Sequence, residues 1–275
     1  VAIILLCCIL LFLDRYRSAM VQSARTSSSQ AVSQVSNTVG SYLRDMGQAM
    51  ELVEQSVSES GESRDWLLAA FLKYRPAVTS YSAGGELLDC WSPGREPREN
   101  IFQNLSFDLS AARESEGAYM TAPHVETIFE GYYPWVVTMT APLEGGGEAA
   151  WVSLDISFSS ISSYLKNVSI GQRGYCFLMD REGNIVYHPQ QQLLYAGLKS
   201  EDTEALAALE DGDYADDTVI YCLASVEGSD WRAVGVSYVD ELVNRNVNDM
   251  IRLSCLLAVV VLGAALLTSW LLFRF

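Results

Sequence analysis

Uncharged apolar runs at the two ends of the chain constrain its fold more than any other feature. The C-terminal run, residues 253–273, has no charged side chain over 21 residues. At about 1.5 Å of rise per residue, a helix of this length crosses the roughly 30 Å of hydrocarbon in a bilayer. The N-terminal run, residues 1–13, is shorter and does not begin with Met, and the DRYR that follows it has none of the cleavage features of a signal peptide. We therefore predict a truncated first transmembrane helix at residues 1–13 and a second one at residues 251–273.

The segment between the two runs is strongly acidic. It contains all 34 acidic residues and 17 of the 18 basic ones, which gives it a formal charge of −17. Nucleic acid is excluded as a partner, because binding it needs a concentrated positive surface. Three of the six cysteines, Cys90, Cys176 and Cys222, lie in this segment. Because three is an odd number, the segment is not a disulfide scaffold.

The first part of this segment is predicted to be helical. Residues 16–59 contain no proline and place apolar side chains at three- and four-residue steps, which is typical of one long amphipathic helix. We place this helix at residues 14–64, with Gly40 and Gly47 as weak points. A shorter helix over residues 62–74 is expected to stop before Pro76.

The rest of the segment contains the same series of strands twice. Residues 77–91 and 174–188 each show a strand, a polar turn with glycine and a second strand, and Gly85 aligns with Gly183. Further on, residues 137–157 resemble residues 219–237, with Trp151 over Trp231, an alignment that sets Asp155 over Gly235. Two copies of one α+β module explain this order of parts.

The hairpin GYCFLMDREGNIVYHP, which begins at Gly174, resembles the first hairpin of a Cache module. The tandem arrangement with a long helix and two flanking spans resembles the double Cache (dCache) sensor regions of bacterial receptors, most of all those of sensor histidine kinases. This resemblance implies an α+β fold with two PAS-like modules, each an antiparallel sheet in which the fifth strand lies between the first and the fourth. It also implies that a membrane-distal module, residues 65–160, binds a small solute and that a membrane-proximal module, residues 161–250, relays the signal. In that strand order Cys176 and Cys222 are separated by one strand, about 10 Å, which is too far for a disulfide.

Asp155 is the first candidate for contact with a ligand. In the segment AAWVSLDIS an apolar set of side chains alternates with Trp151, Ser153 and Asp155, so the carboxylate lies on the polar face of a strand. The resemblance implies that an Asp at this position accepts the ammonium group of a ligand. A structural ion pair or a turn amide would satisfy the same carboxylate.

Aromatic residues with polar tips precede the strand that pairs with that of Asp155. Such side chains suit a small zwitterion or cation through stacking, hydroxyl and cation–π contacts, although each could equally fill the core. The full candidate set is Asp155, Trp135, Tyr133, Tyr119, His124 and Trp91. Amino-acid-binding members of the family carry an Arg followed closely by Trp-Tyr. Here only Arg113 lies nearby, without a Trp beside it, so an ordinary α-amino acid is in doubt as the ligand.

Other motifs are weaker. The acidic residues 211–217 lack the ligand pattern of an EF-hand and are expected to form a solvated turn. Ser163 and Lys166 match S-x-x-K, but the accompanying motifs of serine acyl-enzymes are absent, so both are expected on a helix that joins the modules. His188 is expected to play a structural role. We predict no catalytic site, no metal and no cofactor.

The resemblance therefore implies the input region of a receptor in a bacterial plasma membrane, with residues 14–252 outside the cytoplasm. A homodimer along the long helix is expected, and a HAMP linker with a histidine kinase is the first expectation for the output. A chemoreceptor or a diguanylate cyclase is the alternative. A membrane-anchored hydrolase, in which Ser163, Lys166 and His124 would converge, and a structural ectodomain without ligand are rivals of other classes.

Overall fold

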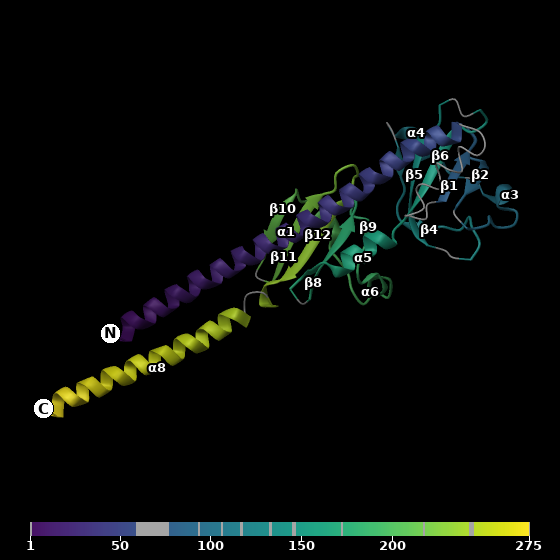
Figure 1. Cartoon of the computed structure of the whole chain (residues 1–275). Helices are drawn as coiled ribbons and strands as arrows, with labels where there is room; N and C mark the ends of the chain where they lie inside the picture. Colours follow the sequence, from purple (N-terminus) through teal and green to yellow (C-terminus); the bar gives the residue numbers. More distant parts are fainter. Residues whose placement is uncertain are drawn as a thin grey trace.

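The computed structural model shows one long helix that runs past two sheets (Figure 1). It describes residues 2–58, 77–92, 94–105, 107–115, 118–131, 134–144, 147–171, 173–216, 218–241 and 245–274. The predicted helix at residues 62–74 and the candidate Tyr133 lie outside these residues.

The long helix α1, Ala2–Ser58, continues without a break from the N-terminal apolar run into the amphipathic segment. The C-terminal helix α8, Arg245–Arg274, contains the one stretch among the described residues that is long and apolar enough for a membrane span, Asp249–Leu271. Both helices run to the same end of the molecule, where the two termini lie (Figure 1). The sheet nearer to that end is called the proximal sheet and the other the distal sheet.

The two sheets have the same topology. The distal sheet has the order β2-β1-β6-β5-β3 with β4 also on β5, and the proximal sheet has the order β10-β11-β12-β8-β7 with β9 also on β8. The strand pairs among the described residues are antiparallel, and the predicted strand order is confirmed in both copies. The distal strands are β1 Ala77–Tyr81, β2 Leu87–Trp91, β3 Tyr119–Met120, β4 His124–Val125, β5 Trp135–Pro142 and β6 Trp151–Ser157. The proximal strands are β7 Ser169–Ile170, β8 Gly174–Met179, β9 Ile185–Tyr187, β10 Gly212–Ala215, β11 Val219–Ser225 and β12 Arg232–Tyr238.

Short helices connect the strands. Helix α5, Ser159–Asn167, joins the two sheets, as expected for the segment that holds Ser163 and Lys166. The others are α3 Ile101–Asn104, α4 Ser110–Glu114, α6 Gln191–Tyr195 and α7 Thr203–Ala207.

The turn glycines confirm the internal repeat. Gly85 and Gly183 both have a φ of 89°, a left-handed conformation that glycine adopts without strain. A Cβ on Gly85 would collide with the carbonyl oxygen of Phe107, and one on Gly183 would lie 3.1 Å from that of Thr203. Each hairpin therefore turns tightly against the backbone of the segment that follows it.

Helix α1 packs one apolar stripe against both sheets. Val32, Val35, Val39 and Leu43 belong to the core of the proximal sheet. Over roughly the next three turns, Met46, Ala49, Met50 and Val53 belong to the core of the distal sheet. The three- and four-residue spacing of these side chains is the one that predicted the helix.

Gly235 on β12 lies directly beneath α1. It pairs with Cys176 on one side and Cys222 on the other, so a strand separates the two cysteines as predicted, and both are free thiols. A Cβ at this position would collide with Val32 and lie 3.0 Å from Ile170 Cδ1. Glycine is therefore what lets the helix approach the sheet.

The expected correspondence of Asp155 with Gly235 is wrong by one residue. Asp155 pairs with Ala77, whereas Gly235 pairs with Cys176 and faces α1. In the observed strand register Asp155 corresponds to Val236. Strand β6 begins at Trp151 itself, whereas β12 begins at Arg232, one residue after Trp231. Since Val236 is uncharged, a carboxylate at this position is still peculiar to the distal copy.

Candidate functional site

Asp155 lies on the face of the distal sheet that points away from α1. Its strand neighbours Leu154 and Ile156 belong to the core beneath α1, so Asp155 faces the opposite side. The carboxylate is buried, with only 5% of the residue exposed. The hydroxyl of Thr138, directly across on β5, donates to it at 2.6 Å.

Further polar side chains continue this face. Thr140 Oγ1 and Ser153 Oγ are 2.8 Å apart, and Thr79 on β1 pairs with Ser153. All three side chains are buried. Hydroxyl groups from three neighbouring strands thus share this face with the buried carboxylate.

His124 extends the hydrogen bonds of the site. Its Nε2 lies 3.3 Å from Thr138 Oγ1, and its Nδ1 lies 3.1 Å from the carbonyl oxygen of Ala122. Because the Thr138 hydroxyl donates its proton to Asp155, its oxygen is free to accept from the imidazole. A chain of polar contacts therefore links Asp155 to an exposed residue of β4.

A second carboxylate on this side already has its cation. Glu126 is 2% exposed and accepts from the amides of Ile128 and Phe129. Arg95 Nη1 lies 2.6 Å from Glu126 Oε2, and its guanidinium also stacks 4.9 Å above the ring of Phe129. Asp155, by contrast, forms no ion pair with any residue that the structure describes.

The surroundings of Asp155 make its charge costly. Burial raises the pKa of this carboxyl to about 6, and the Thr138 hydrogen bond and the nearby His124 only partly oppose the increase. A ligand cation that reached the carboxylate would supply the missing opposite charge.

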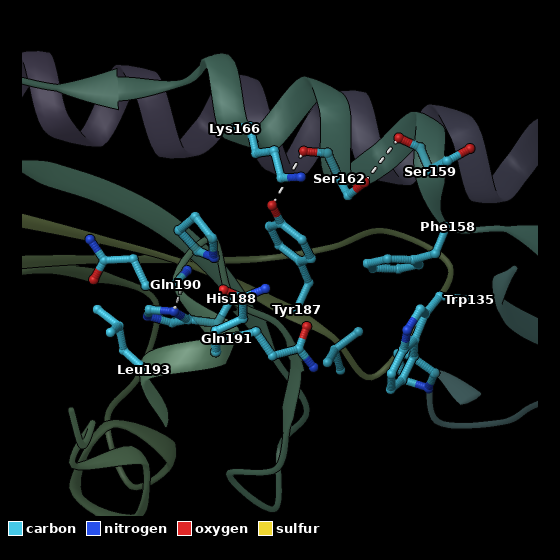
Figure 2. A pocket seen from close by; sticks show the side chains of 14 residues that line it. Trp135, Phe158, Ser159, Ser162, Lys166, Tyr187, His188, Gln190, Gln191 and Leu193 are labelled. Atoms are coloured by element: carbon cyan, nitrogen blue, oxygen red, sulfur yellow. Dashed lines mark hydrogen bonds between the residues drawn. The ribbon is translucent and has the colours of Figure 1, made fainter. Parts of the chain in front are cut away.

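The structure brings only some of the predicted residues together. Tyr119 pairs with Thr140 and so shares the face of Asp155 and His124. Trp91 pairs with Val78 and packs into the core beneath α1, so it lies on the opposite face from Asp155. Trp135 also lies on the other face and lines a cavity between the modules, which Figure 2 shows.

The sequence analysis missed Thr138, Glu126 and Arg95. The alternation of Thr138 and Thr140 in VTMTAP is a signal that could have revealed the first of them, because it matches the alternation of Asp155 and Ser153. No local pattern links Arg95 to Glu126, which only the fold brings together.

The equivalent face of the proximal sheet contains a cation from the chain itself. Tyr175, beside Val236, has the ammonium of Lys199 3.7 Å from its ring centroid, and Lys199 Nζ lies 3.3 Å from Glu201 Oε1. Tyr175 donates to Glu201 at 2.7 Å. His188 is also at 3.3 Å from this carboxylate and packs against Tyr175, which gives it the structural place that was expected. The proximal face is therefore filled, whereas on the distal face no described residue forms an ion pair with Asp155.

We expect Glu201→Ala to destabilise the protein by about 2 to 4 kcal/mol, because it removes a buried acceptor shared by a tyrosine, a histidine and a lysine. Thermal unfolding of the detergent-solubilised chain measures this loss. Glu210→Ala, an exposed carboxylate nearby, serves as the control and should change stability by less than about 0.5 kcal/mol. Equal effects of both variants would contradict the assigned role.

The acidic segment 211–217 is not the turn that was expected, because Gly212–Ala215 form strand β10 and pair with β11. Asp211 accepts from Arg232 Nη2 at 3.0 Å, and Asp216 accepts from the amides of Thr218 and Val219. Ser163 lies exposed on α5.

Two PAS-like modules on one helix are the architecture of a tandem sensor region. The chain belongs to the Cache domain family, whose dCache_1 profile matches residues 16–245. This confirms the family that the hairpin motif indicated.

Solved structures with a similar fold are ligand-binding domains of chemoreceptors. The domain of Pseudomonas aeruginosa PctC in complex with GABA is 14% identical, with a TM-score of 0.56, and the match covers 77% of this chain and 98% of that one. The sensory domain of Campylobacter jejuni Tlp3 with isoleucine bound is 13% identical, with a TM-score of 0.59, covering 82% and 97%.

A curated relative is also a chemoreceptor. The methyl-accepting chemotaxis protein PscA of Pseudomonas syringae pv. tomato is 22% identical over 195 residues, which are 66% of this chain but 29% of PscA. The chain thus spans under a third of the length of this relative. The relatives named here are chemoreceptors, whereas the sequence first suggested a histidine kinase.

Proposed function

We propose that this chain is the ligand-sensing input region of a bacterial chemoreceptor, and that its distal module binds a small primary amine through Asp155. The observation that carries the proposal is a buried carboxylate that forms no ion pair with a described residue. Burying such a charge is costly unless a partner neutralises it. A ligand ammonium is a partner of the right charge and size.

The relatives support the ammonium as the recognised group. The structures named above and the Pseudomonas aeruginosa PctB domain in complex with L-Arg contain ligands that differ in length and charge, but each has an amino group. In this chain Arg95, a guanidinium on that side, is already paired with Glu126. A ligand carboxylate would therefore have to compete for Arg95, which favours an amine over an ordinary α-amino acid.

Helix α1 offers a route for the signal. The Tyr42 hydroxyl donates to the carbonyl of Ser157 on β6 at 3.0 Å, two residues beyond Asp155. Ser28 on the same helix contacts Ser237 on β12 at 3.0 Å. A movement of β6 on ligand binding would thus shift α1 against the proximal sheet, to the extent that the ligand prefers one arrangement.

The remaining parts of the proposal concern the whole receptor. We place residues 14–252 outside the plasma membrane, with α8 as the membrane span and the N-terminal run as part of another. Two copies would pair along α1, and the receptor's output would lie beyond this chain. Neither a catalytic role nor a cofactor is part of the proposal, and Ser163→Ala should leave ligand affinity unchanged.

A thermal-shift screen of the whole chain in detergent tests the amine site, with ethanolamine, putrescine, GABA, L-leucine and acetate as probes. An amine at about 100 times its Kd should stabilise the protein by about 2.7 kcal/mol, and Asp155→Asn should abolish the shift. Asp89→Asn, an exposed aspartate of the same sheet, is the matched control and should retain it. A shift that survives Asp155→Asn, or a response to acetate alone, would contradict the proposal.

A further inference from the structure

A cavity of about 530 Å³ lies where the two modules meet. The distal module contributes Pro123 and Trp135, the connecting helix α5 contributes Ser162 and Lys166, and the proximal module contributes the segment from Val186 to Leu193. This volume falls within the range of about 300 to 1,000 Å³ that is typical of small-molecule sites. The cavity is separate from Asp155, which faces the other side of the distal sheet.

The charge of the cavity is opposite to that of the chain. The protein has a formal charge of −16, yet none of the residues that line the cavity is acidic, and Lys166 is a cation among them. Lys166 is exposed and forms no ion pair with the described part of the chain. Gln190 accepts from Lys199 through its amide oxygen at 2.8 Å, which leaves its amide NH₂ as a donor.

The other side of the cavity is aromatic. Trp135 is 46% exposed, although a tryptophan usually buries most of its surface. Figure 2 shows Trp135 and Phe158 at one end of the cavity, Gln190 and Leu193 at the other, and Lys166 near Tyr187. The Tyr187 hydroxyl donates to the carbonyl of Ser162 at 3.3 Å, so its ring is held in place from α5.

We propose that this cavity is a second ligand site, which binds a small organic anion with a carboxylate at Lys166 and a flat apolar body against Trp135. A flat body would cover the exposed indole, and the carboxylate would pair with the lysine in a cavity without competing acids. Such a ligand would touch both modules and α5 at once. The site goes beyond the amine sensor proposed above, because it needs the opposite charge and different residues.

The test uses the whole chain in detergent with phenylacetate and its neutral amide, and it compares benzylamine in the Asp155→Asn variant, where the distal amine site is removed. Binding is measured by calorimetry and ligand-observed NMR. Phenylacetate should bind saturably below about 10 mM and at least about tenfold more tightly than the other two. Lys166→Gln should weaken it by about tenfold or more, whereas Lys166→Arg should retain it. Arg44→Gln removes an exposed cation on a different helix, α1, and should have no effect on phenylacetate binding.

Three results would overturn the site: no saturable binding of phenylacetate, equal binding of its amide, or full affinity in Lys166→Gln. Asp155→Asn keeps the two proposals distinguishable. It should abolish the amine response but leave phenylacetate binding intact, so that either site can fail without the other.

Discussion

Gly235→Ala destabilises the protein by about 2 to 3 kcal/mol, because the added Cβ has no room between β12 and α1. That atom would collide with Val32 and lie 3.0 Å from Ile170 Cδ1. The helix would have to move away from the sheet, and the contacts of its apolar stripe would loosen along the proximal core. Thermal unfolding of the detergent-solubilised chain measures the loss.

Two further variants make this result specific. Gly47→Ala lies on α1 with nothing within 4 Å of the new Cβ, so it should stabilise the helix by up to about 1 kcal/mol. Val32→Ala removes the methyl groups that Gly235→Ala would meet. The double variant should therefore be more stable than the sum of the two single losses predicts, by about 1 kcal/mol or more. If the losses of stability in the two single variants are additive, Val32 and position 235 are not in contact, which would contradict the packing of α1 on Gly235.

The pH dependence of amine binding is the second large effect that we expect. In the ligand-free protein burial raises the pKa of Asp155 to about 6, and an ammonium binds only the ionised form. The affinity for an amine should therefore fall about tenfold for each pH unit below 6. Calorimetry near pH 5.5 in two buffers of different ionisation enthalpy should also show a proton released on binding.

The same pKa determines how Asp155→Asn affects stability. A raised pKa in the folded state favours folding when the carboxyl is protonated, and this contribution is lost as the pH rises from about 4 to about 6. Above that range the ligand-free protein carries a cost on the order of 3 kcal/mol. Asp155→Asn should thus raise the melting temperature at pH 7.5 and have little effect at pH 4. A loss of stability at pH 7.5 would contradict an unpaired carboxylate.

Much of the fold could be predicted because the strands alternate and the turn glycines repeat. Candidate residues that lie away from Asp155, such as Trp91, are positioned by features that such patterns do not determine. Tyr81 pairs with Leu87 but Ser80 pairs with Asp89, so a bulge lies between them. Without this bulge Trp91 would lie opposite Ala77, on the face of Asp155. One extra residue therefore transfers the tryptophan to the core under α1.

In the candidate site, too, some positions could be predicted from the sequence and others could not. The burial and direction of Asp155 follow from the alternation of its strand, and Trp135 could have been placed on the other face by the same rule. The ion pair of Arg95 with Glu126 joins residues 31 positions apart in sequence through loops. No periodic pattern extends over such a distance, so only the folded structure reveals that this cation is already engaged.

The lysine over Tyr175 makes the two modules unequal in a way that bears on the response of the receptor. A tethered ammonium has an effective concentration in the millimolar range or above, whatever the medium contains. If the distal module is the amine site proposed above, the proximal module is a copy whose ammonium the chain itself supplies, so its state does not vary with outside amines. A duplicated sensor built this way has one variable amine input and one fixed reference, and its response to amines follows the occupancy of the distal site alone.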